Sequence, residues 1–248
     1  MVFLLGLAMS LFALPLGPAA AQDASAPAAE RATAQLPGSF QWSSSGQLIA
    51  PKPDASHPVV SVKDPTVIQA GANTLDYWVI CDDAKCYLFS SDDNGHLFRS
   101  ETTVGEFPGG FRNTQLVLED SKFALFEGDA VYRVQGTDTY LLMMEAIGSD
   151  GRRYYRSFTA QGLTGQWQPL AATESNPFAR SNNVSFPAGA WTRDISHGEL
   201  IRTGNDQTMT INPCRLQFLY QGMNPSAGGD YSQLPWRLGL LTQTNATC

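Results

Sequence analysis

Apolar and polar positions alternate in short runs along most of the chain, and this pattern predicts strands rather than helices. No long stretch places apolar residues at i, i+3, i+4 and i+7, the spacing of an amphipathic helix. Short strands separated by Gly-rich turns, such as DNG at 93–95 and GSDG at 148–151, predict an all-β meander, hence a sandwich, barrel or propeller. The runs that predict strands are 76–81, 86–91, 96–100, 115–120, 130–134, 140–146, 153–159, 216–222 and 236–243.

Three of these runs contain an aromatic residue followed by a basic one (LFRS, VYRV and YYRS). This is a faint repeat of the kind that propeller blades would give, too degenerate to establish a propeller by itself.

The N-terminal pattern differs from the rest. Residues 1–21 combine an apolar run with the small residues AAA at 19–21, which is typical of a secretory signal peptide, although a basic n-region is lacking. Residues 22–37 are rich in Ala, Ser and Pro and predict a flexible lead-in. Residues 38–248 then form one globular domain of a secreted, extracellular protein, which we expect to be a monomer.

Composition and net charge narrow the classes of binding partner that we expect. The formal charge is −7 and only 16% of the residues are charged. An acidic, sparsely charged surface argues against nucleic acid and anionic membranes, and it is compatible with a neutral polysaccharide.

Four cysteines allow three disulfide pairings, which secretion would permit. Cys81 and Cys86 flank a tight hairpin, and Cys214 and Cys248 are the other natural pair. The alternative, that Cys81 and Cys86 are buried free thiols, stays open at this point. Sequons begin at Asn183 and Asn245, although such short patterns often arise by chance.

Three carboxylates stand beside apolar strand residues: Asp64 in VKDPTVI, Asp76 in LDYWVI and Glu127 in LFEGDAVYRV. A half-buried carboxyl has a raised pKa and suits a general acid, and an ionised neighbour supplies a base. Two such groups on either side of a glycosidic bond are the minimum for glycoside hydrolysis. On local pattern alone, however, an acid before Pro or at a strand start is an ordinary turn or strand end.

A resemblance changes that weighting. From Phe40 to Cys248 the chain resembles glycoside hydrolase family 62, the secreted non-reducing-end α-L-arabinofuranosidases that act on arabinoxylan. The blocks that carry it are FQWSSSGQLIAPK (40–52), VKDPTVI (62–68), WVICDDAKCYLFSSDDNGHLFRS (78–100), LFEGDAVY (125–132), EAIGSDGRRYYRS (145–157), ESNPFARSNNVSF (174–186), WTRDISHGELIR (191–202) and LPWRLGLLTQTN (234–245).

The resemblance implies a five-bladed β-propeller and hydrolysis with inversion at one mouth of the central channel. It implies Asp64 as general base, Glu127 as general acid, and Asp76 as the residue that orients substrate and tunes the pKa of the acid. No cofactor is required.

It also implies weaker assignments for substrate-binding residues. Lys63 resembles a residue that reaches the bound arabinose, and otherwise is a surface lysine. Tyr231 resembles a tyrosine of the xylan cleft, although Ser232 follows where the family often has Asn. His197 resembles a residue that lines the channel and helps to hold a structural cation or water, and otherwise is a hydrogen-bonded core histidine. Glu145 and Glu199 are interpreted as structural or substrate-adjacent acids, not catalytic ones.

The resemblance breaks between Ile68 and Leu75, where only seven residues, QAGANTL, separate two strands that belong to different blades in the family. More than one blade, at about 40 residues or more each, is absent, so we expect an incomplete propeller lacking part of blade one and blade two. The main hypothesis is an arabinofuranosidase acting on arabinoxylan. The alternatives are an inactive truncated isoform or gene-model variant with residual xylan binding, and a related five-bladed β-xylosidase.

Overall fold

The computed structural model describes residues 35–52 and 75–248, apart from the side chains of Leu75 and Asp76. These residues lie in one compact unit, Thr33–Cys248. The predicted signal peptide, most of the lead-in, Lys63 and Asp64 lie outside the described residues. Within the described ranges, no helix is long and apolar enough to cross a membrane.

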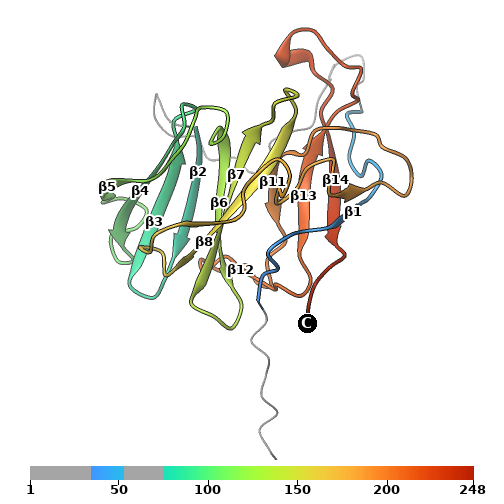
Figure 1. Cartoon of the computed structure of the whole chain (residues 1–248). Helices are drawn as coiled ribbons and strands as arrows, with labels where there is room; N and C mark the ends of the chain where they lie inside the picture. The colour runs from blue at the N-terminus through green and yellow to red at the C-terminus, as the bar shows by residue number, and fades with distance from the viewer. Residues whose placement is uncertain (1–34, 53–74) are drawn as a thin grey trace, which may run out of the picture. The chain divides into compact units, whose positions relative to one another are not determined.

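Strands make up three sheets, which follow one another from β2 to β14 in Figure 1. The first has the order β2-β3-β4-β5, the second β12-β6-β7-β8-β9, and the third β10-β1-β14-β13-β11. The strands are β1 (Trp42–Ser44), β2 (Leu75–Cys81), β3 (Lys85–Ser91), β4 (His96–Thr103), β5 (Arg112–Glu119), β6 (Glu127–Val134), β7 (Thr139–Ile147), β8 (Arg153–Gln161), β9 (Gln168–Ala171), β10 (Val184–Ser185), β11 (Ser196–Leu200), β12 (Thr210–Ile211), β13 (Gln217–Gly222) and β14 (Arg237–Gln243).

All nine predicted strands are confirmed, and the only helical element in the described residues is the short 3-10 helix η1 (Tyr231–Gln233). The strands that the pattern missed are β1, β9, β10, β11 and β12, each of two to five residues. Runs of that length contain too few positions for alternation to show. The expected all-β architecture, with an incomplete propeller, is therefore correct.

The two ends of the domain meet in the third sheet. Strand β1 pairs antiparallel with β14 and parallel with β10, so that Trp42 faces Gln243 on one side and Val184 on the other. The Trp42 side chain is buried, and its indole N–H donates to the carbonyl of Phe178 at 2.6 Å. The pairing of the first described strand with the last holds the sheet together from both ends of the chain.

Consecutive sheets pack face to face through large side chains. Trp78 of β2 lies 5.0 Å from Tyr132 of β6, measured between ring centroids, and its indole N–H donates to the Val131 carbonyl. Tyr155 of β8, on the same face of the middle sheet as Tyr132, lies 5.0 Å from Phe218 of β13. The middle sheet is thus in contact with both of its neighbours.

One face of the first sheet is apolar but only partly covered. Val79, Leu88 and Phe98 alternate with the residues that pack on the middle sheet, and they are only half-buried. Leu116, which pairs with Phe98, is 47% exposed. In a closed propeller the next blade would cover such a face, so this apolar face agrees with an open ring of sheets.

Both expected disulfides are present, and the alternative that Cys81 and Cys86 are free thiols is wrong. Cys81 and Cys86 are directly opposed across the β2–β3 hairpin and are bonded. Cys214 is bonded to Cys248, which ties the C-terminus to the loop before β13.

We predict that the two disulfides contribute unequally to stability. They close sequence separations of 5 and 34 residues. The loop-entropy relation gives about 2 kcal/mol for the first and about 4 kcal/mol for the second. Urea unfolding of Cys81→Ser/Cys86→Ser and Cys214→Ser/Cys248→Ser should show the larger loss of unfolding free energy in the second. Equal losses would contradict this order.

Candidate active site

A β-bulge at the start of β6 orients Glu127. Glu127 pairs with Glu145 of β7, but the next pair is Ala130 with Met143, so β6 contains one extra residue between the two pairs. Gly128 supplies it with φ of 66°, a conformation that L side chains rarely adopt. A Cβ at Gly128 would also lie 2.9 Å from the Tyr155 hydroxyl. Bulges of this kind redirect a side chain beside a functional site.

Two carboxylates share one guanidinium at this end of the middle sheet. Arg153 Nη1 donates to Glu127 Oε1 at 3.1 Å and to Glu145 Oε1 at 3.3 Å. The side chain of Glu145 is completely buried, whereas that of Glu127 is 21% exposed. Like charges directly opposite in a sheet repel each other, and the cation between them offsets that repulsion.

The charge state of Arg153 follows from these neighbours. Burial by itself lowers the pKa of the guanidinium, but the carboxylates of Glu145 and Glu127 outweigh burial, so the pKa of Arg153 lies above its ordinary value. The Tyr231 hydroxyl acts in the same direction, which places Tyr231 in the electrostatic surroundings of Arg153. Arg153 is therefore a permanent cation beside Glu127.

Arg153 is fixed along its whole length. Its backbone N–H donates to Asp194 Oδ1 at 3.1 Å, and its carbonyl accepts from the Ile195 N–H. Its guanidinium carbon lies 4.3 Å from the centre of the Phe126 ring, a cation–π arrangement. Because Phe126 directly precedes Glu127, the same few residues set the positions of the acid and of its cation.

Glu145 connects this group to the third sheet. It accepts hydrogen bonds from the Ser196 hydroxyl at 2.7 Å and from the His197 backbone N–H at 3.0 Å. Gln221 Nε2 in turn donates to Ser196 Oγ at 3.2 Å. The start of β11 is thus joined to the carboxylate end of the middle sheet by buried polar contacts, which are costly to break.

Several of the predicted site residues lie in the same region. Glu127 is within hydrogen-bonding distance of Arg153, and Tyr231 lies near enough to influence Arg153. His197, half-buried on β11, reaches the group through its backbone N–H. Asp76 belongs to β2, which packs against β6, but its side chain is outside the described residues, as are Lys63 and Asp64.

The predicted cleft residue Tyr231 is 50% exposed at the start of η1. Asp230 caps this short helix by accepting from the Ser232 N–H at 2.9 Å and from the Ser232 hydroxyl at 2.6 Å. The serine at the position where the family often has Asn is therefore used for local capping.

Arg153 and Gly128 are the residues that sequence reasoning missed. The glycine directly after Glu127, inside an otherwise apolar strand, was an available signal for a bulge. Arg153 had no comparable signal, because its importance arises from the pairing of β8 with β7, which places it diagonally across from Glu145.

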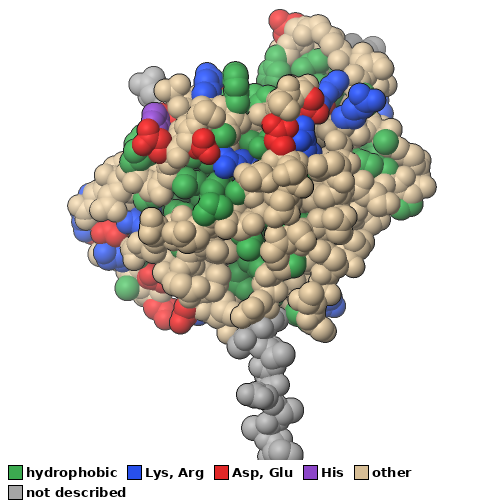
Figure 2. All heavy atoms as spheres, viewed as in Figure 1, with side chains coloured by type: hydrophobic (Ala, Val, Ile, Leu, Met, Phe, Trp, Pro, Cys, Tyr) green, Lys and Arg blue, Asp and Glu red, His purple; other side chains and the backbone are tan. Residues whose placement is uncertain are grey.

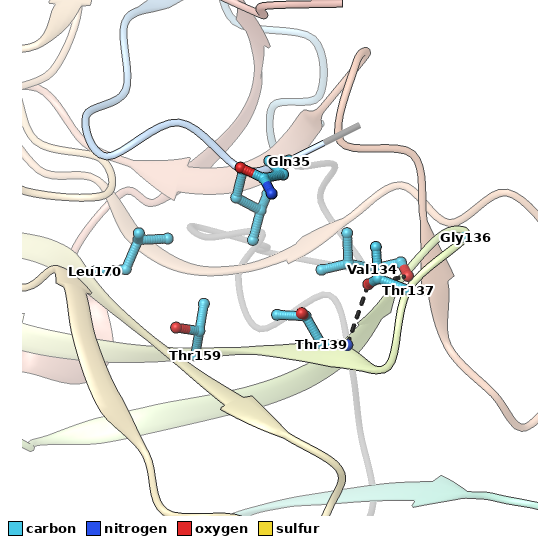
Figure 3. Close-up of a pocket in the computed structure, with 8 residues that line it drawn as sticks. Gln35, Val134, Gly136, Thr137, Thr139, Thr159 and Leu170 are labelled. Atoms are coloured by element: carbon cyan, nitrogen blue, oxygen red, sulfur yellow. Dashed lines mark hydrogen bonds between the residues drawn. The ribbon is translucent and has the colours of Figure 1, made fainter. Parts of the chain in front are cut away.

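A separate pocket lies at the opposite end of the same strands (Figure 3). Its volume is about 370 Å³, and Thr137, Thr139 and Thr159 line it together with Val134 at the far end of β6. Seven residues of strand, about 23 Å, separate Val134 from Glu127, so this pocket is not part of the carboxylate site. Thr137 Oγ1 accepts from the Thr139 N–H at 3.1 Å, drawn as the dashed line.

Charge is unevenly distributed on the face seen in Figure 2. Acidic and basic side chains are interspersed along its upper edge, the edge at which η1 lies in Figure 1, whereas the centre of the face is mostly uncharged. In the part of the chain that the structure describes, no three His, Cys, Asp or Glu side chains are grouped to hold a metal ion.

Incomplete propeller sheets with acidic side chains at one strand end define the class of protein: an all-β protein with a candidate carboxylate site. A family model, "Glycosyl hydrolase family 62", matches residues 37–242. The chain belongs to this family.

Individual relatives agree. The chain is 47% identical over 192 residues to "Alpha-L-arabinofuranosidase C" of Cellvibrio japonicus (strain Ueda107), covering 76% of this chain and 30% of that protein. Two solved structures are similar: the catalytic domain of the Coprinopsis cinerea GH62 alpha-L-arabinofuranosidase (39% identity, TM-score 0.81, 86% of this chain and 100% of that one), and a GH62 hydrolase in complex with xylotriose (50% identity, TM-score 0.66, 69% and 56%). The chain thus spans about a third of the curated relative's length.

Proposed function

We propose that the chain is a secreted α-L-arabinofuranosidase that removes arabinose side chains from arabinoxylan with inversion at the anomeric carbon. The observation that carries the proposal is the half-buried Glu127, aimed by a glycine bulge at the end of a propeller sheet in a family 62 chain. The relatives named arabinofuranosidases and the xylotriose complex of a GH62 hydrolase support the substrate class.

In the mechanism, Glu127 in its protonated form gives its proton to the departing xylose oxygen. Asp64 takes a proton from a water molecule that attacks the anomeric carbon from the opposite face, which forms the new C–O bond as the glycosidic bond breaks. For inversion the two carboxyl groups stand about 6.5–9.5 Å apart, leaving room for this water. Asp76, ionised near Glu127, favours the protonated form of the acid by like-charge repulsion.

Substrate contacts complete the proposal. Lys63 reaches the arabinose, Tyr231 offers an exposed aromatic ring to the xylan backbone, and His197 lines the channel. Hydrolysis by two carboxylates and a water calls for no cofactor.

The test is arabinose release from wheat arabinoxylan by the full chain, followed by proton NMR during the first minutes. We expect β-arabinofuranose to appear first, because inversion of an α-linkage gives the β-anomer. First appearance of the α-anomer would contradict inversion. A folded protein that releases no arabinose would contradict the activity itself.

A second candidate function, xylan binding without turnover, is favoured by the half-exposed apolar face of the first sheet. That face agrees with missing blades, and catalysis falls steeply when groups are misplaced by about 1 Å. Retention of the chain on immobilised xylan, without arabinose release, would identify this function instead.

A further inference from the structure

The contact between Arg153 and Glu127 conflicts with the role proposed for Glu127. A positive charge within hydrogen-bonding distance favours the ionised form of a carboxyl group. A general acid must instead carry a proton before the reaction begins. The arrangement seen here, with Arg153 Nη1 3.1 Å from Glu127 Oε1, therefore suits Glu127 after it has lost its proton.

The two ends of this contact differ in how firmly they are held. Glu145 is completely buried and receives hydrogen bonds from Ser196 and His197 in addition to Arg153. Removing the cation from a buried carboxylate is strongly unfavourable. Glu127 is partly exposed, so water can replace Arg153 at its carboxyl group. Arg153 is consequently held mainly by Glu145, and the contact between Arg153 and Glu127 is the one that can be released.

Resting on the proposed function, we infer that Arg153 is a positioning residue that docks Glu127 in its ionised form, and that Glu127 becomes the acid only when this contact is released. Glu145 is the anchor that keeps Arg153 in place during the change. The stacking of Arg153 on Phe126 keeps the guanidinium beside the strand start while Glu127 turns toward the substrate oxygen.

Other ionisable groups lie on β6 and its neighbours, some of them, such as Arg133 and Tyr140, at the end opposite to Glu127. Arg153 is a cation in direct contact with Glu127. The ionisable side chains on β6 and on elements packed against it, apart from the three already discussed, are Asp76, Tyr77, Lys85, Tyr87, Asp129, Tyr132, Arg133, Tyr140, Tyr154, Tyr155, Arg156, His197, Glu199 and Tyr231.

The inference predicts that two substitutions shift the pKa of Glu127 in opposite directions. Glu145→Gln removes a negative neighbour and leaves Arg153 to Glu127 alone, so the pKa of Glu127 should fall below that of the unmodified chain. Adding Arg153→Met to this variant removes the cation without leaving a buried charge, so the pKa of Glu127 should then rise by about 1–3.

The decisive measurement is the pKa of Glu127 from NMR titration of the full chain labelled at glutamate Cδ, with the resonance assigned by its absence in Glu127→Gln. We expect the pKa of Glu127 to be highest in Glu145→Gln/Arg153→Met, intermediate in the unmodified chain and lowest in Glu145→Gln. Equal values in the single and double variants would overturn the inference. Arg112→Gln, which removes a remote cation paired with Glu106, is the matched control and should leave the pKa of Glu127 unchanged.

Where Glu145→Gln does not fold, the pair Arg153→Lys and Arg153→Gln isolates the same charge, and the pKa should be higher in the second. In activity, the alkaline limb of the kcat/KM profile should move to higher pH in Arg153→Gln and stay in place in Arg153→Lys. A purely structural role would lower the rate without moving the limb. If the unmodified chain released no arabinose, the proposed function would fail, while the titration would still decide whether Arg153 holds Glu127 ionised.

Discussion

Glu127→Gln is expected to lower kcat for arabinose release from arabinoxylan by about 100- to 10,000-fold, the range that general acid catalysis contributes. Glutamine has no proton to give to the departing xylose oxygen. Its side-chain oxygen can still accept from Arg153, and the Gly128 bulge remains, so the fold should be unaffected. The loss should therefore lie in kcat rather than in stability.

The leaving group provides the sharper test. An aryl arabinofuranoside with an acidic phenol departs without protonation, so Glu127→Gln should retain most of its activity on that substrate. Asp64→Asn, which removes the proposed base, should lose activity on both substrates. Equal losses for Glu127→Gln on xylan and on the aryl substrate would refute its role as the acid.

The control is another Glu→Gln change of the same size. The side chain of Glu119 is 66% exposed at the end of β5. Glu119→Gln should leave kcat and unfolding temperature unchanged. A similar loss in both variants would point to a general effect of charge instead of chemistry at Glu127.

Long strands were predictable because each offers many positions to one pattern. In β7, Thr139–Ile147, an apolar run with turn residues at both ends suffices to identify a buried strand. The two residues of β12 carry no such signal, since only the neighbouring β6 makes them a strand. The same reasoning explains why β10 and β11 were missed.

The candidate site also contains residues that the local sequence predicts and residues that only strand pairing reveals. Glu127 could be proposed because an acid beside apolar strand residues is unusual and because the family block contains it. Arg153 could not, since it is one of two adjacent arginines at a strand start and only the register of β7 against β8 distinguishes it. Pairing across strands is a property of the fold, and a local pattern does not contain it.

Asn183 shows how a local pattern can indicate the wrong chemistry. It begins a sequon, yet its side chain is buried and forms four hydrogen bonds to the backbone. Its Nδ2 donates to the carbonyls of Phe40, Pro177 and Phe178 at 3.0, 3.0 and 3.1 Å, and its Oδ1 accepts from the Arg180 N–H at 2.7 Å. A glycan at this nitrogen has no place in the folded domain, whereas Asn245 is only half-buried, with its Nδ2 donating to the Ser39 carbonyl at 2.9 Å.

Asn183→Ala should accordingly lower the unfolding free energy by roughly 3–6 kcal/mol, because each buried polar group left without a partner costs about 1–3 kcal/mol. The carbonyl of Phe178 keeps its bond from Trp42, so the loss falls on Phe40, Pro177 and Arg180. These residues join the segment before β1 to the loop before β10, so the third sheet should be the first to open.

Urea unfolding of the full chain measures this loss, and two variants make the result specific. Asn182→Ala, at an exposed neighbour that makes one bond to the Glu174 carbonyl, should cost less than about 1 kcal/mol. Asn183→Asp keeps the acceptor for Arg180 but turns a carboxylate oxygen toward three carbonyls, so it should be at least as destabilising as Asn183→Ala. A mild effect of Asn183→Asp would mean that the three donated bonds, which join the segment before β1 to the loop before β10, contribute little to stability.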